Sequence, residues 1–326
     1  MFRASICLSV CFSIGLLSAQ QAPFEGPTEG VIFDAPTRSF RTIAGSLGSA
    51  FLGPAVLADF NYGSVAPHKN YGLAFRDGRC FLVSAVDSQQ ASITMLPGCF
   101  NMPEDVAWSG DGSAAVLYSR TEGWLRILSG LPGSPTSASL AVVLPGSHVS
   151  TVAADYDGSH VLIGITGDMP GVYLLRKDQT LSPILPLANP TALGIAGTIA
   201  YVIDAGTSQV FELSLADLSS QSWRFDGVTD PIAIQASQDA AMRSVIYIAG
   251  GSDHTLLVYD AGSHNLIAPV QLDFAPTMMV PLGQHGFLLR PRLTAEDTIW
   301  TSTDDSPPAA YFIPATPLRF PEDSRR

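Results

Sequence analysis

Two stretches of the chain have nearly the same pattern: Val106–Ser119, VAWSGDGSAAVLYS, and Val152–Thr166, VAADYDGSHVLIGIT. In each, apolar residues lead into an Asp-Gly pair, and a second apolar run follows it. An Asp-Gly pair between two short apolar runs indicates a tight turn between antiparallel strands, because glycine accepts the positive φ that such turns need. The two stretches therefore predict the same β-hairpin, written twice 46 residues apart.

The hairpin pattern recurs along most of the chain. The equivalent apolar positions are Val65, Val106, Val152, Ile195, Ile234 and Val280, at intervals of 41, 46, 43, 39 and 46 residues. A recurrence near 43 residues predicts a repeated supersecondary unit. Within a unit, short apolar runs alternate with turns rich in Gly, Asp, Asn and Ser, which is typical of antiparallel strands. We expect each unit to contain three or four strands in a meander.

A single sheet of roughly 40 residues cannot bury both of its faces, and radial packing against neighbouring sheets solves this in a β-propeller. The sequence therefore predicts an all-β chain, with four-stranded antiparallel blades in one domain over residues 30–315. Six repeats are visible, and strand-like sequence from Gly30 favours a seventh blade over the six-bladed alternative. We expect C-terminal strands, such as those in TIWTST and AAYFIPA, to complete that blade and to remove an exposed sheet edge. Residues 316–326 are expected to form a tail.

The repeat resembles those of bacterial β-propellers of the YVTN, NHL and WD-repeat-like superfamily. The residues that carry the resemblance are Val106-Ala107-Trp108-Ser109, Asp111-Gly112 and Val116-Leu117-Tyr118, with weaker copies over roughly residues 60–315. The chain departs from WD repeats in having neither the Gly-His nor the Trp-Asp pair in register. The resemblance implies an architecture and leaves the activity open, because propellers host many functions.

The first 19 residues have the composition of a secretory signal peptide. One positive charge at Arg3 precedes an apolar run, and small residues follow at Ser18 and Ala19. The run holds about a dozen residues, which is short of the roughly 20 that a membrane-spanning helix needs. We therefore expect cleavage near Ala19 and a secreted or periplasmic chain with no transmembrane segment. A membrane anchor is the alternative.

The charge composition limits the class of partner. Only 14% of the residues are charged, the formal net charge is −12, and the chain has two lysines, Lys69 and Lys177. An acidic surface repels the phosphate backbone of nucleic acids, so a nucleic-acid partner is not expected. The expected partner is a protein or a carbohydrate.

Two cysteines, Cys80 and Cys99, lie beyond the predicted signal peptide. The run between them resembles a hairpin of two apolar strands, which would bring its two ends together. An oxidising compartment favours a disulfide between them. Two reduced, buried thiols are the alternative.

No complete catalytic motif is present in the sequence. It lacks a G-x-S-x-G elbow, an H-E-x-x-H motif, a phosphate-binding glycine loop and a histidine pair at metal spacing. The six histidines are scattered over the repeats. The stretch Asp155-Tyr156-Asp157-Gly158 is better explained as a turn than as a calcium loop, because no distal ligands follow it.

The loops that lead into the innermost strands of a propeller converge on the mouth of its channel, and here they carry acids and an amide. Gluconolactonase-like propellers hold a divalent metal with Glu, Asn and Asp at similar positions. That resemblance implies Glu104, Asn189 and Asp230 as metal ligands, with Asp105 or Asp230 as the group that moves a proton. The alternative is that these residues only start turns before a strand.

The preferred functional hypothesis is a secreted binding scaffold without catalysis and without a cofactor. The alternative is a calcium-dependent, lactonase-like or glycan-acting enzyme that uses the acids at the channel mouth. The four tryptophans, Trp108, Trp124, Trp223 and Trp300, are expected to pack between blades.

Overall fold

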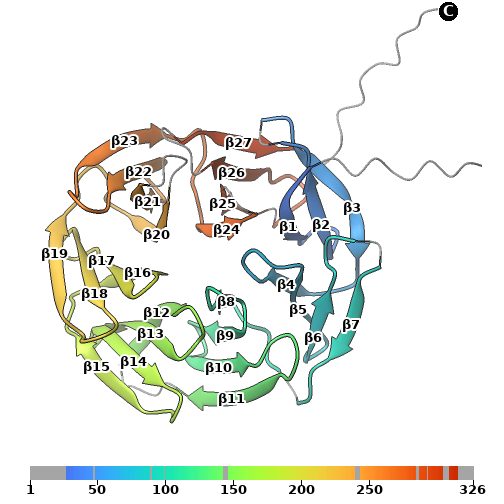
Figure 1. Ribbon diagram of the computed structural model, residues 1–326, viewed down its shortest axis with the longest axis horizontal. Helices are drawn as coiled ribbons and strands as arrows, with labels where there is room; N and C mark the ends of the chain where they lie inside the picture. Colours follow the sequence, from blue (N-terminus) through green and yellow to red (C-terminus); the bar gives the residue numbers. More distant parts are fainter. Residues whose placement is uncertain are drawn as a thin grey trace, which may run out of the picture.

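The computed structural model is a ring of seven antiparallel sheets around a central axis (Figure 1). It describes residues 27–46, 48–88, 90–98, 100–141, 146–238, 243–283, 286–291, 293–303 and 308–314. Every regular element in these ranges is a β-strand. The prediction of an all-β, seven-bladed propeller is therefore confirmed. The predicted signal peptide and the tail at 316–326 lie outside the described residues.

Six blades have four strands, and each blade is continuous in sequence. The strands of each blade are given from the innermost outward. The second blade contains β4 (Tyr62–Val65), β5 (Tyr71–Arg76), β6 (Arg79–Ser84) and β7 (Ser92–Met95), and the third contains β8 (Asp105–Trp108), β9 (Ala114–Ser119), β10 (Trp124–Ser129) and β11 (Thr136–Ala141). The fourth contains β12 (Ser147–Ala154), β13 (His160–Gly167), β14 (Gly171–Arg176) and β15 (Leu181–Leu185). The fifth blade contains β16 (Pro190–Ala196), β17 (Ile199–Asp204), β18 (Gln209–Ser214) and β19 (Ser220–Arg224). The sixth contains β20 (Pro231–Gln238), β21 (Ser244–Gly250), β22 (Thr255–Asp260) and β23 (Leu266–Gln271). The seventh contains β24 (Val280–Leu282), β25 (Gly286–Arg290), β26 (Ile299–Thr303) and β27 (Ala310–Ile313).

The repeated Asp-Gly pairs form the turns between the first and second strands of the third and fourth blades. Gly112 and Gly158 have φ values of 77° and 69°, in the left-handed region that glycine adopts without strain. In each turn the aspartate accepts a hydrogen bond from the backbone N–H two residues on, from Ser113 at 2.8 Å and from Ser159 at 2.9 Å. The motif therefore repeats because the blade repeats.

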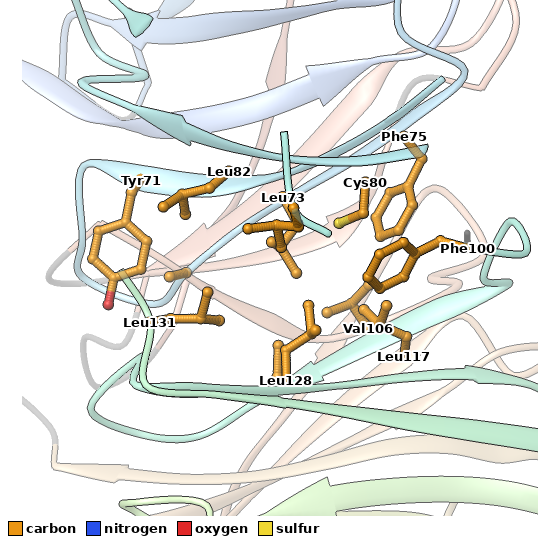
Figure 2. Close-up of a cluster of buried hydrophobic side chains, with 13 residues drawn as sticks. Tyr71, Leu73, Phe75, Cys80, Leu82, Phe100, Val106, Leu117, Leu128 and Leu131 are labelled. Carbon is orange, nitrogen blue, oxygen red and sulfur yellow. The ribbon is translucent and has the colours of Figure 1, made fainter. Parts of the chain in front are cut away.

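The hydrophobic cores lie between blades. Seven clusters of buried side chains fill the seven interfaces between neighbouring sheets. Figure 2 shows the cluster between the second and third blades, in which Leu73 and Leu82 point toward Leu117 and Leu128 of the facing sheet. Each blade thus buries its two faces only by contact with two neighbours, as the sequence predicted.

The first blade differs from the prediction. It contains only three strands, β1 (Thr28–Asp34), β2 (Ser39–Ala44) and β3 (Phe51–Leu57). The C-terminal strands do not complete it: β26 and β27 pair within the seventh blade. The reason is local, because the four strands of the seventh blade follow one another in sequence and each pairs with the next.

The ring closes between the seventh and first blades by packing and by a backbone hydrogen bond. Ile32, Ile43 and Leu52 of the first blade pack against apolar residues of the seventh. At the periphery, the backbone N–H of Leu52 donates to the carbonyl of Pro314 at 3.2 Å. A further hydrogen bond joins the second and seventh blades: Nδ1 of His68, in the turn between β4 and β5, bonds the carbonyl oxygen of Gly283 at 2.5 Å. In the described ranges no helix is long and apolar enough to cross a membrane.

Candidate functional site

Two kinds of connection share one rim of the ring. Because the strands of a blade alternate in direction, the loop that leads into the innermost strand lies at the same end as the turn between the second and third strands. We call this end the upper rim and the first of these connections the lead-in loop. Glu104, Asp105, Asn189 and Asp230 are all at the upper rim, as the sequence predicted. His68, in the turn from β4 to β5, is at the opposite rim.

In the third blade, Glu104 binds the turn of its own sheet. One carboxylate oxygen accepts hydrogen bonds from the Ser119 hydroxyl at 2.8 Å and the Thr121 N–H at 3.1 Å. The other accepts the N–H of Arg120 at 3.1 Å. Hydrogen bonds from Thr121, and then from Ser119, lower the pKa of Glu104 to about 2. The side chain therefore fastens the lead-in loop to the turn.

The neighbouring Asp105 belongs to a small polar cluster at the start of β8. Its Oδ1 accepts the N–H of Val106 at 2.8 Å, and its Oδ2 accepts the Tyr118 hydroxyl at 3.1 Å. The guanidinium of Arg120 lies 3.5 Å from the same Oδ2. Burial, and then the charge of Asp105, raises the pKa of Tyr62 well above its usual range. Asp105 and Arg120 are both partly exposed, so this cluster can meet a polar ligand.

In the fifth blade the acid that binds the lead-in loop comes from the turn. Asp204 is only 2% exposed, and it accepts the N–H groups of Asn189 at 2.8 Å, Gly206 at 3.1 Å and Ala188 at 3.3 Å. It also accepts the hydroxyl of Thr207 at 3.0 Å. The amide side chain of Asn189 itself is exposed.

The sixth blade repeats this arrangement with Asp253. Its carboxylate accepts the N–H groups of Thr229 at 2.6 Å and Asp230 at 3.0 Å, together with the Thr229 hydroxyl at 2.9 Å. The bonds from Asp230, and then Thr229, lower the pKa of Asp253. Asp230 is exposed, and its Oδ2 accepts the Ser252 N–H at 3.3 Å.

These contacts give the candidate ligands a role within their blades. Glu104, Asn189 and Asp230 each take part in the bonding between a lead-in loop and a turn of the same sheet. Within the described ranges, no three His, Cys, Asp or Glu side chains form a group that could hold a metal ion. The assignment of Glu104, Asn189 and Asp230 as a metal site stays a prediction, as do the catalytic roles of Asp105 and Asp230.

Asp204 is the residue that sequence reasoning missed. A signal for it exists, because Asp34-Ala35-Pro36-Thr37 and Asp204-Ala205-Gly206-Thr207 share the pattern Asp-Ala-x-Thr at the end of a strand. In both, the threonine hydroxyl donates to the aspartate, at 2.6 Å in the first blade. The repeat marks an acid that holds a turn.

An apolar hollow lies at the outer part of the upper rim of the fourth blade. Its volume is about 420 Å³, and it is lined by Met169, Pro170, Gly171, Tyr173, Pro183, Ile184, Leu185 and Pro186. Met169 is 50% exposed. The Tyr173 hydroxyl donates to the Met169 carbonyl at 3.1 Å, so the ring presents an apolar surface. The volume is in the range of small-ligand sites.

The remaining predicted residues have structural surroundings. Trp108 and Trp124 pack in the cluster between the second and third blades, and Trp223 and Trp300 pack in interblade clusters farther along the chain. Cys80 is fully buried, and burial raises the pKa of its thiol to about 12. Its predicted partner, Cys99, lies outside the described residues.

No protein family matches the chain in sequence, and no curated protein does so either. Solved structures match it in fold. A protein from Lactobacillus plantarum has a TM-score of 0.59 at 14% identity, covering 85% of this chain and 92% of that one. The dihydro-heme d1 dehydrogenase NirN, in complex with DHE, has a TM-score of 0.55 at 13% identity; 87% of this chain is covered, and it spans 63% of the NirN chain. At such low identity the likeness is one of fold, and the chain is a seven-bladed β-propeller.

Proposed function

We propose that this protein is a secreted or periplasmic binding scaffold that recognises a protein or carbohydrate partner and has no catalysis of its own. The observation that carries the proposal is the apolar hollow of the fourth blade. Pro170 and Pro183 offer a rigid apolar wall beside the flexible, polarisable thioether of Met169, and a methionine adapts to differently shaped partners. An apolar side chain of a protein partner, or the apolar face of a sugar, fits this chemistry.

Three acids at the upper rim, Glu104, Asp204 and Asp253, support the same proposal. A metal-assisted hydrolase needs carboxylate oxygens free to coordinate a cation. Both oxygens of Glu104 accept hydrogen bonds within the third blade. The carboxylates of Asp204 and Asp253 likewise accept hydrogen bonds within their own blades.

The test is a binding screen of the purified mature protein against extracellular proteins and glycans, with two matched variants. Met169→Glu places a charge in the hollow, and Leu293→Glu places one at an exposed apolar residue of the seventh blade. We expect a partner whose affinity falls at least tenfold in Met169→Glu and is unchanged in Leu293→Glu. Equal binding by both variants, for every partner found, would rule out the hollow as the site.

Thermal unfolding with excess calcium or with a chelator separates the scaffold from the enzyme. A ligand at 100 times its dissociation constant stabilises the folded state by about 2.7 kcal/mol, which raises the midpoint by a few degrees. We expect no calcium-dependent shift. A rise that is lost in Asp230→Ala, together with hydrolysis of a lactone, would replace the scaffold with the calcium-dependent enzyme.

A further inference from the structure

Three arginines gather between the first and second blades, which are neighbours in the ring (Figure 1). Arg38 lies in the turn between β1 and β2, and Arg76 and Arg79 flank the turn between β5 and β6, at the upper rim. Arg76 and Arg79 are directly opposite in the antiparallel register, so their side chains leave the same face of the sheet. That face is turned toward the first blade, because Phe81, two residues beyond Arg79, packs in the cluster between the two blades. We call the three arginines the arginine cluster.

The lead-in loop of the second blade positions two of these side chains. Nε of Arg38 donates to the carbonyl of Phe60 at 3.1 Å, and the N–H of Phe60 donates to the carbonyl of Arg38 at 3.1 Å. The guanidinium carbon of Arg76 lies 5.5 Å from the centre of the Phe60 ring and 5.4 Å from that of Phe81. Both rings are buried, so they form an apolar floor under the Arg76 guanidinium. One buried residue, Phe60, therefore holds arginines from two blades in place.

The arginine cluster has no acid paired with it. Among the described residues, no carboxylate forms an ion pair with any of its members, and none accepts a hydrogen bond from Arg76 or Arg79. Arg41, Arg120 and Arg290, by contrast, are each paired with an aspartate. Like charges directly opposite on a sheet are destabilising, so Arg76 and Arg79 lower the stability of their blade unless an anion covers them. In a chain of net charge −12, such a positive spot indicates a site for an anionic group.

The surroundings of the cluster favour a carboxylate on a protein segment. A guanidinium presents its N–H groups in one plane, which matches the two oxygens of a carboxylate. Arg38 and Arg79 are exposed, and so are the flanking acids Asp59 and Asp77. A polymer with a charge on every unit would meet repulsion from both of these acids. A protein segment with one or two acidic residues among neutral ones would place its carboxylates on the arginines and avoid that repulsion.

We propose that the arginine cluster binds an acidic segment of a partner protein through one or two side-chain carboxylates. These carboxylates accept the N–H groups that Arg76 and Arg79 leave without a partner, and they offset the repulsion between the two guanidinium groups. The site is separate from the hollow of the fourth blade, and its test does not depend on that hollow.

Titration of the full mature protein with a designed peptide tests the site. The peptide is a short Gly-Ser sequence that carries two glutamates, and its control carries two glutamines instead. We expect the Nε–H signals of isotope-labelled Arg38, Arg76 and Arg79 to shift saturably with the first peptide and to stay unchanged with the second. Arg79→Gln should weaken binding about fivefold, whereas Arg224→Gln, which removes the same charge from an exposed position in β19, should not. The absence of a saturable shift, or equal weakening by both variants, would overturn the proposal.

A gain of affinity gives an independent measurement that a damaged fold cannot imitate. Asp77→Asn removes a flanking negative charge, and asparagine accepts the positive φ of 51° at this position. We expect this variant to bind the glutamate peptide about twofold more tightly, and Asp226→Asn, at an exposed position in the lead-in loop of the sixth blade, to bind it unchanged. Equal affinities in these two variants would contradict the site.

Two competitors separate the sources of the anion. Oligogalacturonate that binds the same three arginines more tightly than the peptide would overturn the protein partner in favour of an acidic glycan. Competition by inorganic sulfate as strong as that of the peptide would show an adventitious ion only. We expect both to compete more weakly than the glutamate peptide.

Discussion

Two glycines with the same backbone conformation offer a direct measure of how much the closure of the ring depends on one close contact. Gly197 and Gly283 both have φ of 59°, in the left-handed region. A Cβ at Gly197 would meet no atom within 4 Å. A Cβ at Gly283 would fall inside contact distance of the carbonyl oxygen of Glu29, in the first blade. Gly197→Ala therefore introduces backbone strain alone, and Gly283→Ala introduces the same strain plus a clash between the first and last blades.

The magnitudes follow from these two terms. A left-handed conformation costs an alanine about 1–2 kcal/mol, of which about 0.4–1 kcal/mol is offset because alanine restricts the unfolded chain. We thus expect Gly197→Ala to lower the free energy of unfolding by about 1 kcal/mol. Overpacking against backbone adds about 1–3 kcal/mol, so about 3 kcal/mol is expected for Gly283→Ala. For a chain of about 300 residues, these values correspond to midpoint shifts of roughly 2 and 5 °C.

The assay is thermal and urea unfolding of both variants, followed by circular dichroism. Native spectra that match the original protein show that each variant still folds, and an unchanged urea m-value shows that the same surface is exposed on unfolding. Equal destabilisation by the two substitutions would refute the reasoning, because the packing of Gly283 on Glu29 would then add nothing to the cost of the backbone conformation.

Three further outcomes follow from the upper rim and the second blade. Asp204→Asn turns an N–H₂ group toward buried donors, so it should lower the free energy of unfolding by about 3 kcal/mol. Asp230→Asn, at an exposed site with one weak hydrogen bond, should lower it little. Similar losses of unfolding free energy in both variants would contradict the role of Asp204. Hydrogen bonds lower the pKa of Glu104 from 4.5 to about 2. They therefore stabilise the fold above about pH 4.5, and this contribution is lost as the pH falls toward 2. The midpoint of thermal unfolding should fall more steeply between pH 4.5 and 2 in the original protein than in Glu104→Gln. A disulfide between Cys80 and Cys99 predicts that the denatured, unreduced mature chain takes up no alkylating label by mass spectrometry, and two labels would establish free thiols.

The blade architecture could be predicted because one local signal recurs at a regular interval. Asp111-Gly112 and Asp157-Gly158 fix a turn by glycine's conformational freedom, and that requirement is independent of the rest of the fold. Strand direction in the first blade could not be predicted in the same way. Hydrophobic alternation in residues 28–57 is the same whether a strand runs toward the upper rim or away from it, so the three-stranded form of this blade became visible only in the pairing.

The candidate site was predictable in position and not in chemistry. The location of Glu104, Asn189 and Asp230 at one rim follows from strand order, which the repeat establishes. Whether a carboxylate binds a ligand or holds its own loop depends on which N–H groups face it, and this is decided by a few ångströms of backbone geometry. The hollow beside Met169 gathers residues from a turn, two strands and a lead-in loop, and therefore has no local signal in the sequence.

The placement of the cores between blades has a consequence for how the molecule could be rearranged. Seven interfaces around a circle have no first or last member, so the position at which the chain is cut is not fixed by packing. A version that joins the present ends and opens the chain at another lead-in loop would keep all seven interfaces. Removing a whole blade is different in kind, because the other six would have to tilt to meet again, and every remaining interface would change its angle. The ring therefore tolerates a change in the order of its parts far better than a change in their number.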